Sequence, residues 1–501
     1  MTNRFKRSVL RPRVFACAAL LTVLTVSGSA RADEPKDVKL SYVLDIAVQQ
    51  NIGLKSASID VNTADARVLQ ASGIDDWLFD ASGTMFVARF GGAIDLVSAS
   101  ARDVVDLSVS LTKALRSGGT LKLGASTRYN KSVFNLAGQA SVGYSGSLDV
   151  TYTQPLLRGH GEKFARANIT RTRIASNAAQ RKRHALAITV VRDVIVAYWE
   201  LTYAQRSLEI RRGSLALAKE RLRITRAGIK AGAIAPIEAL AVEQVIATRE
   251  EEILASELDV TRRSLTLRRL SGLKIAPGHI DLATSAPVAV KAESFDFKGL
   301  LAHAYERSPE IAVLKAQKKG AKLEVEVTRN GLLPRLDLSM SFGPAGAAGL
   351  PRSAFNQAAR LDGYTFGVTL SYQQALGRTA ARGAMRLSRT TLLSAKLGLI
   401  DARQQIASSL ALTVKTAQVA AGRIKISARA IKLAKQNIKA EKSRFDLGRS
   451  TNFDITQRQE ELKLAQLRFA RATIDYINAT TLIDATTGDL LPRYGIKLSY
   501  K

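Results

Sequence analysis

Residues 194–229 read VIVAYWELTYAQRSLEIRRGSLALAKERLRITRAGI, and this stretch decides the fold. Apolar side chains recur at every seventh position, as Val194, Leu201, Leu208, Leu215, Leu222 and Ile229. The same ladder returns 216 residues later, as Leu410, Ala417, Ile424, Ile431, Ile438 and Phe445. A seven-residue apolar repeat predicts a helix whose seam lies along other helices over many turns. Its return in the same register predicts a chain built by internal duplication.

The composition is that of a structured chain with a large excess of positive charge. Of 501 residues 46% are hydrophobic, and the formal net charge is +31. Such an excess is typical of a solvated basic face, or of proteins that meet an anionic membrane surface, nucleic acid or anionic cargo. No cluster interleaves Lys and Arg with aromatic residues as single-strand binders do, so we predict no nucleic-acid partner.

The N-terminal segment 1–32 is predicted to be a secretory signal peptide. It has a basic head and an apolar run over 14–26 that is too short for a permanent membrane span. The sequence Ala30-Arg31-Ala32 then places small alanines at the cleavage positions. The only cysteine, Cys17, lies within it, which excludes disulfide and Cys-zinc scaffolds from the mature chain. No later apolar run is long enough for a spanning helix, so a membrane location requires a closed β-barrel.

The remainder divides into two repeats with the same order of elements. Each has a short helix, alternating strands, a long helix, a glycine turn and a second short helix. A long helix would measure about 100 Å, and the two short helices of a repeat together match its length. The first repeat is predicted over 33–273, with strands in 78–154, a long helix over 163–230 and short helices over 40–72 and 236–271. A linker follows over 274–296. The second repeat is predicted over 297–489, with strands in 336–372, a long helix over 378–446 and short helices over 297–329 and 453–487, and 490–501 form a C-terminal tail.

The first repeat contains an additional predicted β-hairpin. Residues 105–115 and 120–129 alternate apolar with polar side chains, and Ser117-Gly118-Gly119 forms the turn between them. The second repeat has no counterpart.

Several landmarks in this order resemble the TolC-like outer-membrane efflux protein family over about residues 38–491. They are Leu40-x₆-Ala47-x₃-Asn51, Tyr152-Thr-Gln-Pro-Leu-Leu-Arg-Gly159, Leu447-Gly448-x₅-Asp454-Ile455, and the pairs Asp259/Asp475 and Gly272/Gly488. One departure is Ala375, which stands where the first repeat has Pro155.

The resemblance implies an α+β membrane protein in which long coiled helices form a periplasmic α-barrel. It also implies a homotrimer whose three copies close a transmembrane β-barrel in the outer membrane of a Gram-negative bacterium. Four strands per chain, the family's usual number, would give twelve. The additional hairpin then either lengthens a surface loop or widens the barrel, and both alternatives remain open.

The implied function is that of an exit duct in a tripartite efflux or type I secretion system. Its partners would be outer-membrane lipid, a periplasmic adaptor protein and an inner-membrane pump that supplies the energy. A different class of function is an exported periplasmic coiled-coil scaffold or binding protein without a pore. The alternating strands favour the duct, because a scaffold has no need of lipid-facing strands.

The resemblance places carboxylates at the helix-turn-helix tips, where family members close like an iris. By position, Asp454 and Glu238 fall in an aperture ring, and Gln457 stands at a further position that is acidic in the family. A carboxylate ring attracts cations. An acid in the first turn of a helix is also favoured by the helix dipole alone, so both interpretations remain. The expected adaptor-docking turns are Gly232, Ala233, Ile234, Gly448, Arg449 and Ser450.

Signatures of catalysis are missing from the sequence. The histidines His160, His184, His279 and His303 are scattered without partners at metal-ligand spacing. There is no phosphate-binding loop and no nucleophile elbow. We therefore predict neither enzymatic activity nor a cofactor.

Overall fold

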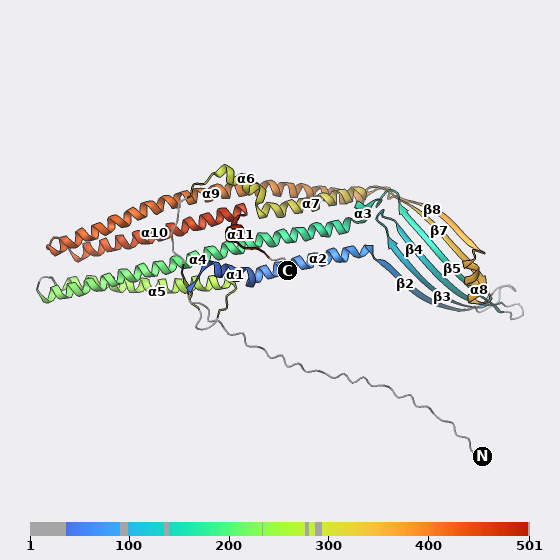
Figure 1. Ribbon diagram of the computed structural model, residues 1–501, viewed down its shortest axis with the longest axis horizontal. Helices are drawn as coiled ribbons and strands as arrows, with labels where there is room; N and C mark the ends of the chain where they lie inside the picture. Colours follow the sequence, from blue (N-terminus) through green and yellow to red (C-terminus); the bar gives the residue numbers. More distant parts are fainter. Residues whose placement is uncertain are drawn as a thin grey trace, which may run out of the picture.

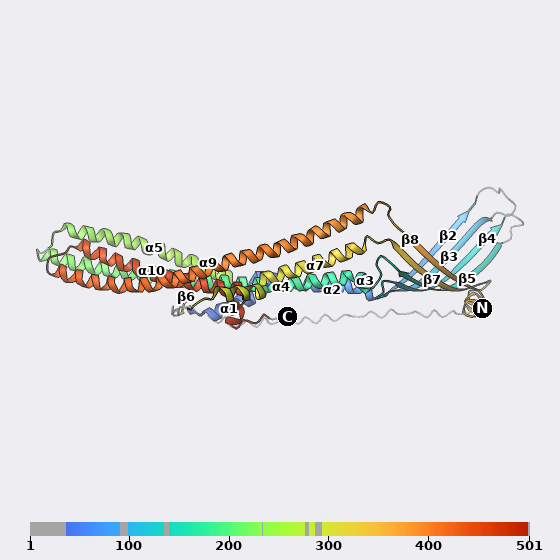
Figure 2. The ribbon, with the colours of Figure 1, turned by 90° about the horizontal axis from the view of Figure 1, so that it is seen from above.

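The computed structural model describes residues 37–90, 99–134, 140–232, 234–275, 280–285 and 293–498. The predicted signal peptide, 1–32, lies outside them. The molecule is elongated: helices follow its long axis, a β-sheet forms one end, and two helix-turn-helix tips form the other (Figures 1 and 2).

Two long helices form the frame of the molecule. They are α4, Ala167–Lys230, and α9, Thr379–Asp446, and at about 1.5 Å per residue each is about 100 Å long. The first is shorter than expected at its N-terminus, because the chain leaves helical geometry at Arg166 after the single turn α3, Glu162–Ala165. Among the described residues, no helix is both long and apolar enough to cross a lipid bilayer.

Shorter helices cover each long helix in two halves. Toward the tips, α5 (Ile237–Ser271) packs on α4 and α10 (Asn452–Thr487) packs on α9. Toward the sheet, α2 (Ile52–Ser72) packs on α4 and α7 (Pro309–Asn330) packs on α9.

The predicted short helices 40–72 and 297–329 are each broken once. The helix α1, Leu40–Gln50, ends at Asn51, whose side chain accepts a hydrogen bond from the Leu54 amide and so begins α2. The helix α6, Phe297–Arg307, ends at Ser308, because the following Pro309 disfavours helical geometry in the residue before it.

A glycine lies where each pair of half-length helices meets end to end. Gly272 ends α5 with φ +78°, and a Cβ there would lie 3.1 Å from the carbonyl carbon of Gln50. Gly488 ends α10 with φ +86°, and a Cβ there would lie 2.9 Å from the carbonyl oxygen of Arg307. A side chain at either joint would push the stacked helices apart.

The apolar core is concentrated at mid-length, around these joints. Val194, Ile195 and Leu201 of α4 are completely buried there, packed against α1 and α5. A second cluster joins Leu410 and Ala417 of α9 to α6 and α10. Two elements that the sequence does not predict add to this region. They are a parallel pair of short strands, β1 (Asp37–Val38) with β6 (Ala283–Thr284), and the helix α11 (Leu490–Arg493), which lies within the predicted tail.

The sheet contains six antiparallel strands in the order β2-β3-β4-β5-β7-β8. The additional hairpin therefore belongs to this sheet, as its strands β3 and β4. In this order the strands comprise Trp77–Arg89 (β2), Ala99–Ala114 (β3), Thr120–Phe134 (β4), Ala140–Pro155 (β5), Arg335–Ala348 (β7) and Tyr364–Gln373 (β8). The connection between the last two strands contains an unpredicted helix, α8 (Pro351–Ala359), which packs against β5 and β7.

The two faces of the sheet differ in polarity. On the face that we call the apolar face, one row of paired residues crosses all six strands: Phe79, Leu111, Leu123, Val150, Phe342 and Phe366. On the opposite, polar face, a row of serines crosses the first four strands: Ser82, Ser108, Ser126 and Ser147. The serine hydroxyls pair at 2.7 Å between Ser82 and Ser108. Successive side chains of a strand point to opposite faces, which explains the division.

The glycine joints yield a stability prediction. Replacing Gly488 by Ala should cost about 1–2 kcal/mol for the left-handed backbone alone, with a further cost from the contact with Arg307. The midpoint of thermal unfolding, followed by the helical circular dichroism of the detergent-solubilised protein, should fall. Gly422→Ala is the matched control: Gly422 is exposed within α9 with nothing within 4 Å of a Cβ. That change should stabilise by about 1 kcal/mol. Equal midpoints for the two variants would contradict the role of the joint.

Candidate functional site: the helix-turn tips

Each tip turns on a glycine with a positive φ. Gly232, between α4 and α5, has φ +74°, and Gly448, between α9 and α10, has φ +72°. Their amides donate to the carbonyl groups of Ile229 and Phe445, at 3.0 and 2.9 Å. A residue with a Cβ would be strained at either position, so the two glycines have a structural role in the turns.

Asp454 closes the first turn of α10. Its Oδ2 accepts hydrogen bonds from the backbone amide of Thr451 at 3.0 Å and from the Thr451 hydroxyl at 2.7 Å. In return, Thr451 Oγ1 accepts from the Asp454 amide at 3.3 Å, which completes a capping box. The hydrogen bonds from Thr451 lower the pKa of Asp454 below its ordinary value. The carboxylate is therefore ionised and oriented at neutral pH.

Asn452 links the two tips. Its side chain is 2% exposed and lies two residues before Asp454. Its Oδ1 accepts from Arg221 Nε at 2.6 Å and from the Thr225 hydroxyl at 3.2 Å, both on α4. Its Nδ2 donates to Glu238 Oε2 on α5 at 3.1 Å. One amide thus joins α10 to both helices of the other hairpin.

Arg221 is a buried cation within this junction. Its guanidinium lies 3.6 Å above the centre of the Phe445 ring, on α9, and the residue is 7% exposed. Burial lowers its pKa, against the opposing influence of Asp446 and Glu238, but a guanidinium remains charged in any case. Its Nη2 is buried without a hydrogen-bond partner among the described residues. Asn452, the Phe445 ring and the nearby carboxylates of Asp446 and Glu238 therefore stabilise this charge together.

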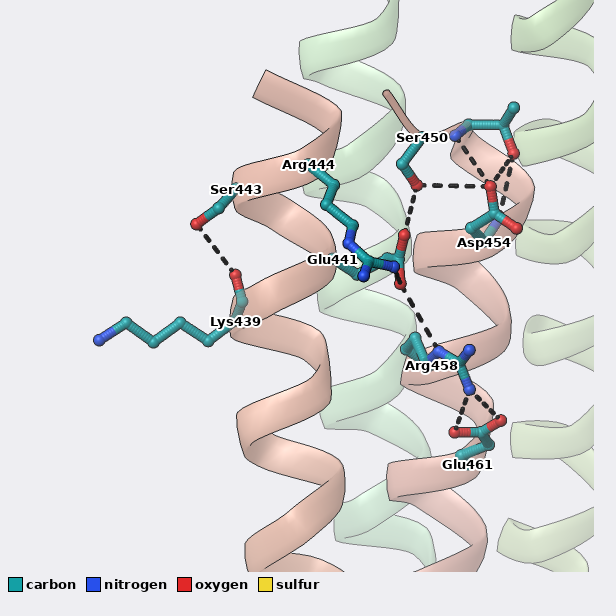
Figure 3. A network of polar contacts seen from close by, with 9 residues as sticks. Lys439, Glu441, Ser443, Arg444, Ser450, Asp454, Arg458 and Glu461 are labelled. Carbon is teal, nitrogen blue, oxygen red and sulfur yellow. Dashed lines mark hydrogen bonds and ion pairs between the residues drawn. The ribbon is translucent and has the colours of Figure 1, made fainter. Parts of the chain in front are cut away.

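A second polar network stiffens the α9–α10 hairpin (Figure 3). Glu441 of α9 is 8% exposed and accepts from the Ser450 hydroxyl at 2.7 Å. Ser450 also lies 3.3 Å from Asp454 Oδ2. On the other side of Glu441, Arg458 of α10 approaches to 3.7 Å and continues to Glu461 at 2.9 Å. This chain of contacts fixes the turn to both of its helices.

The first hairpin is joined by ion pairs along its length. Cations of α4 face acids of α5 in the pairs Arg226–Glu243, Lys219–Glu250, Arg211–Glu252 and Arg212–Glu257, at 2.6–2.8 Å. Most are exposed, so each contributes little to stability. Glu252 is the exception, because it also accepts from Lys463 of α10, whose side chain is 4% exposed.

The comparisons with known proteins identify the family. A sequence profile described as outer membrane efflux protein matches residues 117–273 and 300–489. The chain belongs to the outer membrane efflux protein family. The resemblance drawn from the sequence landmarks is confirmed, as is the predicted location of this efflux protein in the outer membrane of a Gram-negative bacterium, with extension into the periplasm.

Solved structures share the fold at low sequence identity. The outer-membrane channel OprN has a TM-score of 0.67 with 16% identity, covering 91% of each chain. The Campylobacter jejuni CmeC outer membrane channel has a TM-score of 0.64 with 15% identity, covering 92% of this chain and 86% of that one. Nodulation protein T of Rhizobium leguminosarum bv. trifolii is 21% identical over 311 residues, which span 60% of this chain and 63% of that protein.

The structure places the remaining predicted site residues of the efflux protein as follows. Gln457 is exposed on α10, and Ile234 folds back so that its Cδ1 would lie 2.5 Å from a Cβ on Gly228. Arg449 donates its amide to the Arg444 carbonyl at 2.8 Å within the turn. Ala233 lies outside the described residues. In the described part of the chain, no group of three or more potential metal ligands comes together.

The predicted seam changes character along the long helices. Its rungs Val194, Leu201, Leu410 and Ala417 are buried, whereas those nearer the tips (Leu208, Leu215, Leu222, Ile229, Ile424, Ile431, Ile438 and Phe445) are half-buried. The fully buried positions of α4 there are Ser214, Ala218, Arg221 and Thr225. A straight helix drifts by about 20° per heptad, and α4 packs against both α5 and α10, so other faces become buried.

The sequence does not predict Asn452, Arg221 and Glu441, the centres of the tip networks. Arg221 directly precedes the rung Leu222, and a cation beside an apolar seam is the only signal it offers. Asn452 is 231 residues away from it in the chain, and nothing in either residue's neighbourhood indicates the pairing.

Removing the Asn452 side chain tests the link between the tips. Asn452→Ala leaves Arg221 buried without its amide partner, and hydrogen bonds to charged groups contribute about 1.5–3 kcal/mol. Amides in residues 222–240 and 445–460 should therefore exchange with deuterium faster. Gln457→Ala, an exposed change one turn further along α10, should leave the exchange unchanged. Equal protection in both variants would show that Asn452 does not hold the tips together.

Proposed function

We propose that this efflux protein is the outer-membrane exit duct of a tripartite efflux or type I secretion system. It conducts substrates passively from a periplasmic adaptor and inner-membrane pump to the exterior. The observation that carries the proposal is the separation of two ends along one axis. A two-faced sheet forms one end and paired helical turns the other, with helices about 100 Å long between them.

The duct requires several copies, and we infer a homotrimer. The sheet of one chain has open edges at β2 and β8 among the described residues, and such edges must be paired or covered. Toward the tips the packing order is α5, α4, α10, α9, so α5 and α9 form the lateral edges of the helical layer. Three copies joined edge to edge would close both layers. The two halves of the chain have the same order of elements, which supports internal duplication. The helices of the two halves lie side by side and form one continuous helical layer.

The alternative function, a periplasmic scaffold without a pore, fits the sheet poorly. On the apolar face, Phe79 is 64% exposed and Phe366 is 66% exposed in the single chain. A soluble scaffold that exposed such a row to water would be prone to aggregation, whereas lipid solvates it.

The tips are the proposed gate and docking point. The bonds of Asn452 hold the two hairpins of a chain together, so an opening that separates the hairpins must first break them. An adaptor that binds the turns at Gly232 and Gly448 would act directly on this junction. We propose that Asp454 and Glu238, which flank Asn452, supply the carboxylates of the closed aperture. The energy for opening comes from the pump.

The trimer and its conductance test the proposed function. Detergent-extracted outer membranes should contain a species of three times the chain mass that dissociates on heating, and this species should form ion-conducting pores in a planar bilayer. A monomer that forms no pores would overturn the duct and favour the scaffold.

The aperture yields a prediction about block by cations. Asp454→Asn combined with Glu238→Gln removes six carboxylates from the trimer while retaining hydrogen-bonding groups of similar shape. The concentration of hexamminecobalt(III) that halves the conductance should rise about tenfold or more, a loss of about 1.4 kcal/mol or more. Because its pKa is lowered, Asp454 should keep its contribution to block from pH 7 down to pH 5.

The control for this experiment is the double variant Glu251→Ala with Glu257→Ala. It removes the same charge from α5, away from the turns. An equal loss of block in both double variants would show that the effect reflects net charge and not an aperture ring.

A further inference from the structure

The additional hairpin extends over the full height of the sheet. β3 has 16 residues and β4 has 15, whereas a tilted strand crosses a bilayer with about 9–11. Their turn lies at the helix side of the sheet. There the Ser117 hydroxyl donates to Gln154 Oε1 at 2.6 Å, and the Ser117 carbonyl accepts from the Gly161 amide at 2.8 Å. A Cβ on Gly118 would lie 2.4 Å from the Gly159 carbonyl oxygen. The hairpin thus returns to the junction with the helices and is built into it.

The hairpin carries the same two faces as the other four strands. Its apolar face includes Leu107, Val109 and Leu111, which are 41–53% exposed in the single chain. Its polar face includes Ser108 and Ser126, in register with serines on both sides. A loop projecting into water would have no need of an exposed apolar ladder in register with lipid-facing strands.

Aromatic residues mark two levels on the apolar face. Trp77, Tyr152 and Tyr372 lie toward the helices, and Tyr129, Tyr144 and Tyr364 lie toward the far end. Tyr144 and Tyr152 are eight residues apart on β5, about 26 Å along the strand. Such girdles flank the apolar band of transmembrane barrels.

The hairpin takes part in both levels of this pattern. Tyr129 of β4 contacts Tyr144 of β5, with ring centres 5.2 Å apart, and Lys113 of β3 lies 5.6 Å from the centre of the Trp77 ring. Beyond the far level come charges, including the pair Arg89–Asp103 at 2.5 Å. Polar groups outside the aromatic level suit the headgroup region of a bilayer.

Six strands also match the width of the helical layer that they join. At about 4.8 Å between strands and a tilt of about 40°, six strands occupy about 38 Å of circumference and four about 25 Å. The helical layer at this junction consists of α2, α4, α7 and α9 side by side. At about 10 Å between axes, four helices occupy about 40 Å. A six-stranded wall therefore continues the helical wall without narrowing.

We propose that each copy contributes six strands, so that the trimer closes an 18-stranded barrel, with β8 of one copy paired to β2 of the next. This rests on the proposed trimeric duct. With an even number of strands per copy, the antiparallel alternation continues across each junction. Barrel diameter grows about linearly with strand number, so the backbone-to-backbone diameter is about 36 Å, against about 24 Å for twelve strands. With the hydroxyl-rich face inward, the outer mouth would admit hydrophilic solutes too large for a twelve-stranded barrel.

Thiol accessibility tests the placement of the hairpin. In the full chain in outer membranes, single cysteines at Ser108 or Ser110 should react with a membrane-impermeant maleimide that enters through the lumen. Cysteines at Leu107 or Val109 should react at least tenfold more slowly with it, but readily with a maleimide that partitions into lipid. The predicted signal segment contains the only native cysteine, so the background is low.

Matched positions on β7 distinguish a failure of the six-stranded wall from a failure of the proposed membrane duct. Cysteines at Ser341 and Met340 should show the same contrast, because they lie on the polar and apolar faces of a strand outside the hairpin. If β7 shows the contrast and the hairpin positions all react with the impermeant reagent, the barrel exists but the hairpin is a surface loop, and the 18-stranded wall is wrong. If β7 shows no contrast, the proposed membrane duct itself fails.

A deletion variant tests the width. Removing residues 99–134 leaves β2 and β5, which run antiparallel to one another in the sheet. In planar bilayers, polyethylene glycols added on the far-mouth side should enter the intact channel at a larger cut-off size than the shortened one. Equal cut-offs for two trimeric channels would overturn the wider barrel. If the shortened chain does not form trimers, the thiol pattern decides the question alone.

Discussion

The structure depends on how its two long helices are covered. A helix about 100 Å long cannot bury its apolar seam on itself, and neither α4 nor α9 has a partner of equal length within its own hairpin. The solution is two half-length helices stacked end to end along each. Such stacking requires two helix ends to meet without a side chain between them. Gly272 and Gly488, which have no side chains, make this possible at the two joints. The fully buried apolar residues are concentrated around these joints, so the mid-length region anchors both ends of the molecule.

The tips are held in a different way from the mid-length core. There the buried positions of α4 are small or polar, and the contacts between hairpins run through an amide, a guanidinium and carboxylates. Polar contacts of this kind require fixed geometry but bury little apolar surface, so separating them costs less than opening the core. A gate that must open without unfolding the molecule suits this division between an apolar middle and polar tips.

The sheet end follows the rule of alternation over its whole width. Because every strand places one set of side chains toward each face, the register of pairing alone determines whether the apolar sets coincide. They coincide across all six strands, including the hairpin that has no counterpart in the second half. The same register places the aromatic levels on adjacent strands, which local sequence cannot arrange.

The sequence by itself determines the elements that depend on local pattern. The heptad ladder, the alternating strands, the turn glycines and the family landmarks are each contained within short stretches, and they predict the order of long helices, short helices and strands. Only the tertiary structure decides what depends on the approach of distant residues. Ser308 breaks a helix at a proline that is visible in the sequence, but the link of Asn452 to Arg221 joins residues 231 positions apart. The hairpin likewise shows its alternation in sequence, yet its place in the wall follows from pairing with β2 and β5. The physical reason is that side-chain periodicity is set by the geometry of one element, whereas burial, register and ion pairing are set by which elements pack together.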